Sequence, residues 1–192
     1  MDFISKKLTD YIVKKGVIKE EDYEIYHYGL QSGIEVILCI LLSIIIATVL
    51  DVFLESCVVA LVLFSLRAYI CGIHLKRYVS CLVWSTTVLT VGTYLSTFIS
   101  LSRNVVLAIC LLVLPIIHKL SYYTVAYNSQ LEEIAFFTKQ RKRIIVGILI
   151  FLVLLFCFGE SQLIEQVFYA LLVALGSILV EIIRIKVIKK SK

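Results

Sequence analysis

The sequence predicts an all-α integral membrane protein with six transmembrane helices. Of its 192 residues, 60% are hydrophobic and 17% are charged, with a mean hydropathy of +0.98. Globular chains carry about 45–50% apolar and about 25% charged residues, so a soluble domain could not bury this much apolar surface. The apolar residues also form runs separated by short charged links, and there is only one proline. A soluble two-domain enzyme and a disordered regulator are both excluded.

Six stretches can serve as spans, since a helix needs roughly 20 residues to cross a bilayer. The third is the clearest, because no charged residue occurs in the 25 positions from Tyr78 to Ser102. The second is the weakest, because Glu55 and Arg67 lie near its ends. Several uncharged runs are short, so their flanking charges must reach the surface or face protein. The predicted spans are residues 30–50, 52–71, 78–102, 104–117, 144–159 and 162–183.

The basic residues predict the orientation. All but one of the 19 Lys and Arg residues fall on one side of these spans, the exception being Arg103. Cytoplasmic loops carry the excess of Lys and Arg, so both termini are predicted to be cytoplasmic, and the net charge of +5 requires no nucleic-acid partner. The chain is expected to form one polytopic domain over residues 1–192. Its parts are an interfacial cytoplasmic segment 1–29, a membrane region 30–183 and a basic tail 184–192.

The N-terminal segment has the pattern of an amphipathic helix. Apolar residues recur at helical spacing opposite several lysines. This pattern predicts a helix lying on the cytoplasmic leaflet, with the lipid bilayer as its partner. Packing against a partner subunit is the alternative. The apolar residues are Phe3, Ile4, Leu8, Tyr11 and Ile12.

The residues best suited to chemistry lie between the second and third spans. Cys81 is a candidate nucleophile, His74 a candidate base and Arg67 a guanidinium close by. On one continuous helix, His74 and Cys81 would stand about 10.5 Å apart along the axis, too far for proton transfer. If the chain turns between them, Ser80 can cap the third span and Cys81 lies in its first turn. The helix dipole and an imidazolium would there stabilise a thiolate.

Other interpretations of these residues stay open. The histidine can be a capping residue and the cysteine inert, because buried cysteine behaves as a small hydrophobe. Cys71, His74 and Cys81 could supply three zinc ligands, but their spacing matches no usual paired-ligand pattern, so neither metal nor cofactor is predicted. The six cysteines have no repeating spacing and do not form a disulfide framework. Glu35, about one turn into the first span, can orient His74, pair with Arg67 or reach the membrane surface.

Further polar groups on the cytoplasmic side are expected to be structural. His118 lies near the membrane boundary without a nearby nucleophile. The basic run 139–143 is expected to anchor the fifth span, with anionic lipid or substrate contact as a lesser alternative.

The motif Arg67-x-Tyr69-x-x-Gly72-x-His74-x6-Cys81, in a six-span chain of this size, resembles the AgrB family. These are the accessory gene regulator B peptidases of Gram-positive quorum sensing. The resemblance implies a cysteine endopeptidase of the cell membrane, with its active site on the cytoplasmic side. Its catalytic residues would be Cys81 as nucleophile and His74 as base. Arg67 and Gly72 of the same motif, together with Glu35 from the first span, are the candidate supporting or substrate-binding residues.

The resemblance also implies a substrate and a product. The partner would be a short, amphipathic, AgrD-like precursor peptide. Cleavage would release its C-terminal tail and leave a thioester on Cys81. A thiol or hydroxyl of the precursor would then displace Cys81 and close a thiolactone or lactone ring.

Two alternatives come from other classes of protein. A small transporter or permease subunit for a peptide or amphiphile would also have several spans, but the sequence contains no internal repeat and no pair of Gly/Pro-broken helices. A non-enzymatic scaffold or lipid-binding protein is the other alternative. The sequence leaves homodimerisation open.

Overall fold

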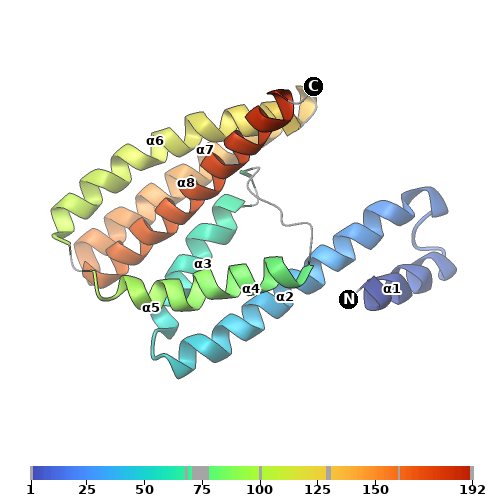
Figure 1. Cartoon of the computed structure of the whole chain (residues 1–192), viewed down its shortest axis with the longest axis horizontal. Coiled ribbons are helices and arrows are strands. Elements are labelled where there is room, and N and C mark those ends of the chain that lie inside the picture. The colour runs from blue at the N-terminus through green and yellow to red at the C-terminus, as the bar shows by residue number, and fades with distance from the viewer. Residues whose placement is uncertain are drawn as a thin grey trace.

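The computed structural model describes residues 2–67, 69–70, 78–99, 101–128, 131–159 and 161–190. Every regular element in this part of the chain is a helix, which confirms the all-α prediction (Figure 1). A 3₁₀ turn, Glu20–Asp22, precedes the second helix, and a π-helical turn, Val88–Gly92, lies between α4 and α5. The α-helices are α1 (Asp2–Lys14), α2 (Tyr23–Val49), α3 (Phe53–Arg67), α4 (Tyr78–Thr87), α5 (Thr93–Ser96), α6 (Arg103–Asn128), α7 (Leu131–Phe158) and α8 (Ser161–Lys190).

The helices form a bundle with a projecting arm (Figure 1). Helices α6, α7 and α8 lie side by side, and α3 packs against α8. Helix α2 runs alongside α4 in the same direction, and its N-terminal part extends beyond the bundle with α1 folded against it. The core lies mainly where α3, α6 and α8 meet, and its fully buried side chains include Val59, Val62, Ile117, Leu171 and Ile178.

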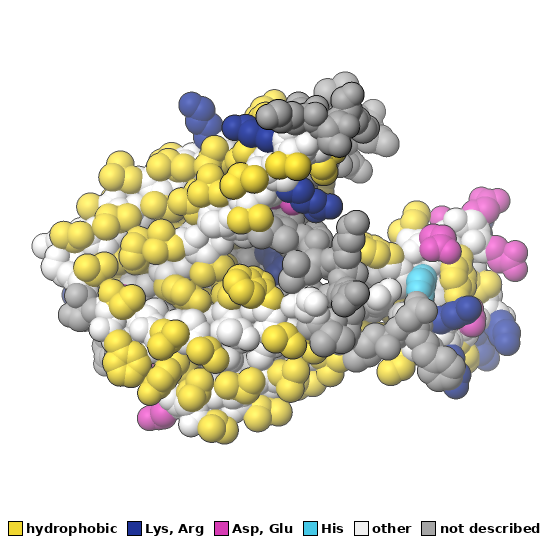
Figure 2. Space-filling view, viewed as in Figure 1, with side chains coloured by type: hydrophobic (Ala, Val, Ile, Leu, Met, Phe, Trp, Pro, Cys, Tyr) yellow, Lys and Arg dark blue, Asp and Glu magenta, His cyan; other side chains and the backbone are white. Residues whose placement is uncertain are grey.

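Two described helices are long and apolar enough to cross a membrane, over Glu20–Val49 and Arg103–Tyr127. Only 18% of the apolar window of the first and 33% of that of the second are buried within the protein. Most of their apolar surface therefore needs another apolar environment. Figure 2 shows hydrophobic side chains spread over the bundle, while many charged side chains gather on the arm. Helices occupy all six predicted spans, but the number of crossings remains a prediction.

Helix boundaries differ from the apolar runs that predicted them. Helix α6 continues past Pro115 to Asn128, and α7 begins at Leu131, well before the apolar run that starts at Ile144. The predicted fourth link is therefore largely helical. The physical reason is that hydropathy marks where a helix would leave lipid, whereas polar and charged residues such as Lys, Glu and Gln are themselves good helix formers and let a helix continue. Neither Gly nor Pro occurs between Pro115 and Gly147.

The predicted N-terminal helix is present as α1, and two small polar residues face inward while its lysines stay exposed. Ser5 and Thr9 are buried, and the Thr9 hydroxyl donates to the Ser5 carbonyl at 2.8 Å. Ile4, Leu8 and Tyr11 are exposed. The apolar face is thus available to a membrane surface, as the predicted interfacial position requires.

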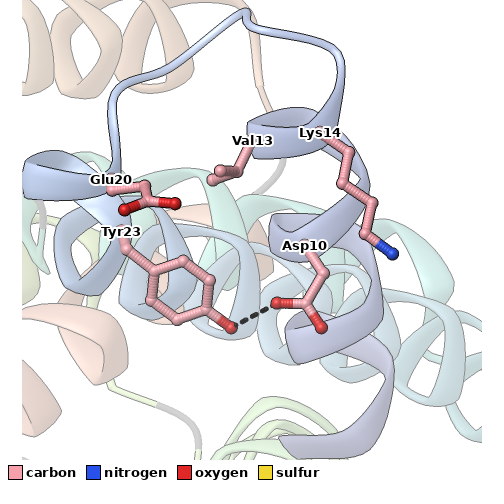
Figure 3. A pocket seen from close by; sticks show the side chains of 5 residues that line it. All are labelled: Asp10, Val13, Lys14, Glu20 and Tyr23. Carbon is pink, nitrogen blue, oxygen red and sulfur yellow. Dashed lines mark hydrogen bonds between the residues drawn. The ribbon is translucent and has the colours of Figure 1, made fainter.

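A hollow of about 400 Å³ lies where α1 meets the start of α2 (Figure 3). Across it, the Tyr23 hydroxyl donates to Asp10 Oδ1 at 2.9 Å and holds α1 to α2. Val13, Lys14 and Glu20 complete its lining. The hollow contains groups of both charges, and the Tyr23–Asp10 bond gives it a structural role.

The predicted third span is not one regular helix. Its π-helical turn leaves backbone carbonyls that neighbouring helices bind. The Tyr169 hydroxyl of α8 donates to the Val88 carbonyl at 3.0 Å, and the Ser56 hydroxyl of α3 donates to the Leu89 carbonyl at 3.1 Å. A Cβ on Gly92 would collide with the Tyr169 hydroxyl, so only glycine allows this approach. These contacts fix α4 and α5 against the bundle.

Arg103 binds the C-terminal end of α7. Its Nη2 donates to the carbonyl of Phe156 and, at 3.0 Å, to that of Leu155, with the Gly159 carbonyl at 3.4 Å. The guanidinium carbon also lies 4.6 Å from the centre of the Phe156 ring. A cation is favourable here because the last carbonyls of a helix carry partial negative charge and lack intrahelical partners.

Candidate functional site

The first turns of α4 position the candidate nucleophile. Helix α4 begins at Tyr78, so the backbone of Cys81 belongs to its first turn, as predicted. Ser80 lies inside this helix, so its predicted role as the N-cap is wrong; helical structure starts two residues earlier, at Tyr78 and Val79. The side chain of Cys81 lies outside the described part of the structure. Cys71, Gly72 and His74 also lie outside the described residues.

Arg67 connects α3 to this part of α4. It is the last residue of α3, and its Nη1 lies 3.5 Å from Ser85 Oγ. Residues four apart share one face of a helix, so Ser85 lies one turn after position 81 on the same face. A guanidinium from α3 therefore lies near the part of α4 that carries the cysteine. Eighteen positions separate Arg67 from Ser85 along the chain, and the fold brings them together.

Glu35 reaches the same level from α2. The Thr86 hydroxyl of α4 contacts Cys39 Sγ of α2 at 3.9 Å, and this contact fixes the register of two helices that run in the same direction. Glu35 lies one turn before Cys39 on α2. Leu82 lies one turn before Thr86 on α4 and directly follows Cys81. Each step covers about 6 Å along its helix, and the two helices run in the same direction, so Glu35 and Leu82 lie at the same height along the bundle. Glu35 is half-buried and continues the helix face that carries Cys39.

Residues of three helices thus lie toward the first half of α4 with complementary chemistry. Helix α3 contributes a cation, α2 a carboxylate and α4 a cysteine in its first turn. The cation and the helix N-terminus favour a thiolate, and the guanidinium can donate several hydrogen bonds to a substrate carboxylate or carbonyl. Among the described residues, no three His, Cys, Asp or Glu side chains form a metal-binding group. The zinc alternative depends on residues outside the described part of the chain.

The sequence interpretation did not single out Ser85, which contacts Arg67. A signal for it existed, because Ser85 lies four positions after the candidate nucleophile and is polar within an apolar span.

Arg141 was expected only to help anchor the fifth span. It is fully buried, and its Nε donates to His118 Nδ1 at 3.3 Å, which joins α7 to α6. His118 is therefore part of an interhelical contact. Nothing in the charge pattern distinguishes Arg141 from its exposed neighbours Lys142 and Arg143.

These features define an all-helical protein with membrane-compatible helices and a polar group of candidate site residues at the start of α4. Comparison with known families gives the identification: the model for accessory gene regulator B, AgrB, matches residues 5–185. The chain belongs to the AgrB family. Membership associates it with the membrane and with peptide processing in agr quorum sensing. No curated protein and no solved structure matches the chain.

Proposed function

We propose that this protein is a multi-pass membrane cysteine endopeptidase that cleaves and cyclises a short AgrD-like precursor peptide on the cytoplasmic side. The observation that carries the proposal is the position of Cys81 in the first turn of α4, one turn before Ser85, which contacts Arg67. Family membership supports the same substrate class, because the family model covers almost the whole chain. Cys81 and His74 are the proposed catalytic residues.

The proposed reaction has two acyl transfers. The Cys81 thiolate attacks the carbonyl carbon that precedes the precursor's C-terminal tail. The C–N bond then breaks, the departing amine receives a proton from the His74 imidazolium, and a thioester links the precursor to Cys81. A thiol or hydroxyl of the precursor attacks this thioester, gives up its proton to His74 and releases Cys81. A thiolactone or lactone ring results.

Ring closure must compete with hydrolysis of the thioester. The proposed site lies at the membrane boundary, where apolar surroundings limit water around the acyl-enzyme. Exchange of one thioester for another costs little free energy, and the uphill part of the reaction is the first step, in which an amide becomes a thioester. The covalent intermediate therefore makes the second step feasible.

The experiment that tests this function is co-expression with a short, amphipathic, AgrD-like precursor peptide, followed by mass spectrometry of cells and medium. We expect a released C-terminal tail and an N-terminal fragment lighter by one water than its linear form, as a lactone or thiolactone requires. Linear hydrolysed fragments alone would contradict the cyclase activity. Accumulation of intact precursor in the medium would favour the transporter alternative.

Arg67 and Glu35 are proposed to position the precursor and the catalytic pair. Arg67→Lys keeps the charge but loses the planar fork, so we expect precursor cleavage to fall about tenfold with normal membrane levels if Arg67 binds a carboxylate in two-point contact. The assay is initial cleavage rate against precursor concentration, with Arg143→Lys as a matched exposed control. If Arg67→Lys cleaves like the wild type, its role is simple anchoring. Glu35→Gln in the same assay tests the carboxylate, and an unchanged rate would remove Glu35 from the site.

A further inference from the structure

In the segment from α4 to α5, several hydroxyl groups lie inside the protein and several apolar groups lie outside, with exposed Thr87 and buried Leu89 as exceptions. Thr90 and Thr93 are fully buried, whereas Val91 and Leu95 are exposed. A helix on the surface of a water-soluble protein has the opposite arrangement. The outer face is therefore suited to lipid, while the inner face creates a polar interior.

Neighbouring helices add polar side chains to this interior. Gln166 of α8 is fully buried, and its amide lies 2.8 Å from the Ser96 hydroxyl. Ser43 of α2 is buried one turn after Cys39, on the helix face that packs against α4 and the π-helical turn. We call this group the polar seam; it consists of Ser43, Thr86, Thr90, Thr93, Ser96 and Gln166.

Two atoms of the polar seam are buried without a hydrogen-bond partner among the described residues: Ser43 Oγ and Gln166 Nε2. Two threonines of the seam do have hydrogen-bond partners: the Thr90 hydroxyl donates to the Thr86 carbonyl at 2.7 Å, and the Thr93 hydroxyl donates to the Leu89 carbonyl at 2.9 Å. A buried polar atom without a partner loses the hydrogen bond that it would make in water. The two side chains therefore call for a ligand that the polypeptide does not provide.

The contacts of Ser96 also show that Gln166 needs a further hydrogen-bond partner. Its oxygen lies 2.7 Å from the Thr93 carbonyl oxygen and 2.8 Å from Gln166 Oε1, but a hydroxyl has only one hydrogen to donate. Turning the amide over removes the conflict, because Nε2 then donates to Ser96 while Ser96 donates to Thr93. Oε1 is then left in the position that Nε2 held. In either orientation, Gln166 needs a further small polar partner.

We propose that water occupies the polar seam and enters at the end of the bundle where Ser96 and Gln166 meet. Water fits because it is small and both donates and accepts hydrogen bonds, as Gln166 and Ser43 require. The six side chains that define the seam carry no charge, so nothing in it favours an ion. The contact between Thr86 and Cys39 closes the other end, which is the end nearer to Arg67 and position 81.

This proposal depends on α4 and α5 lying in the bilayer and does not depend on peptidase activity. In the proposed enzyme it has a further consequence. Water is held in the half of the bundle away from the acyl-enzyme, and the contact between Thr86 and Cys39 separates the two. Loss of this contact would bring water toward the thioester.

The test compares cysteine reactivity on the two faces of one helical segment. Thr90→Cys, Thr93→Cys and Ser96→Cys are made singly in a cysteine-free version of the full chain, with Val91→Cys and Leu95→Cys as controls. In this version Cys39 is replaced by serine, which keeps a hydrogen-bonding partner for Thr86. Each variant is treated in native membranes with 2-aminoethyl methanethiosulfonate, which reacts with thiolates and therefore reports contact with water. We expect the three seam positions to react about tenfold faster than the controls, in the order Ser96, Thr93, Thr90, because thiols ionise in water and not in lipid. The expected contrast between seam and control positions is the reverse of their exposure in the protein without lipid, where Val91 and Leu95 are exposed and the seam positions are buried.

Two results would overturn the proposal: seam positions reacting no faster than the controls, or Gln166→Leu leaving the rate at position 93 unchanged. Size-exclusion profiles and complete labelling in denaturant verify that each variant is folded and its thiol intact. Cysteines at Asp51 and Ser102 are labelled in parallel with an impermeant reagent. If the cysteines at positions 51 and 102 react only from the cytoplasmic side, the proposed orientation is wrong, and with it the cytoplasmic active site. The comparison between seam and control positions would still test the water-filled seam.

Discussion

Cys81→Ala is expected to abolish precursor cleavage while the protein still accumulates in the membrane. Without the thiolate no acyl-enzyme forms, and loss of a catalytic nucleophile lowers turnover at least about a thousandfold. The measurement is tail release from the co-expressed precursor, normalised to the amount of membrane-inserted protein. Helix α4 should persist, because alanine is the best helix former and the contacts that fix the segment lie further along it.

Other cysteines provide the controls. Alanine at Cys57 or Cys157, which are exposed, should leave cleavage nearly unchanged, because neither lies near the start of α4. Cys39 and Cys110 are buried, so alanine there should alter stability more than the cleavage step. Cys39→Ala also removes the contact with Thr86, so its effect is expected on hydrolysis of the thioester and not on cleavage. Cys71 is the informative comparison, because it belongs to the same motif. Inactivity of Cys71→Ala together with activity of Cys81→Ala would reverse the assignment of the nucleophile.

His74→Ala is expected to leave Cys81 as an ordinary thiol. An ordinary cysteine is about 3% ionised at pH 7, so a wild-type thiol half-ionised at this pH would alkylate about fifteenfold faster than the variant. The reason is that an imidazolium stabilises a neighbouring thiolate by charge. The rate of iodoacetamide alkylation between pH 5 and pH 9 measures this, with Cys81 as the single remaining cysteine. The expected result is a pH profile displaced toward higher pH in the variant.

The same experiment separates a base from a metal ligand. If His74 bound zinc together with Cys81, chelation by EDTA would change the wild-type profile and abolish cleavage. If His74 acts as the base for Cys81, EDTA should change neither the alkylation profile nor the cleavage of the precursor. An alkylation profile that is identical with and without His74 would refute the pair, whatever the cleavage assay gives.

Much of the fold follows from the distribution of apolar residues. Charge-free runs located the helices of the bundle, and the periodicity of residues 3–12 located α1. Helix ends were less predictable, because the sequence signal for leaving lipid is not the signal for ending a helix, as α6 and α7 show. The π-helical turn could not be predicted, because it depends on the hydroxyls of Tyr169 and Ser56 from other helices.

The candidate site was predictable in part for a similar reason. Local spacing placed Cys81 in the first turn of a helix, and α4 confirms it. The contact between Arg67 and Ser85, and the level of Glu35, depend on the packing of three helices and have no local signature. The hydroxyls of the third span did carry a signal: positions 86, 90, 93 and 96 repeat at helical spacing and therefore share a face.

Arg103 is subject to two opposing demands during biogenesis. In the proposed orientation it is the one basic residue outside the cytoplasm, so the nascent chain must carry its positive charge across the bilayer. Once the chain has folded, the same charge binds the last carbonyls of α7 and stacks on Phe156. A neutral residue would make insertion easier and leave the end of α7 without this partner. Membrane insertion and helix packing therefore favour different residues at this position, and the arginine found there is the one that serves packing.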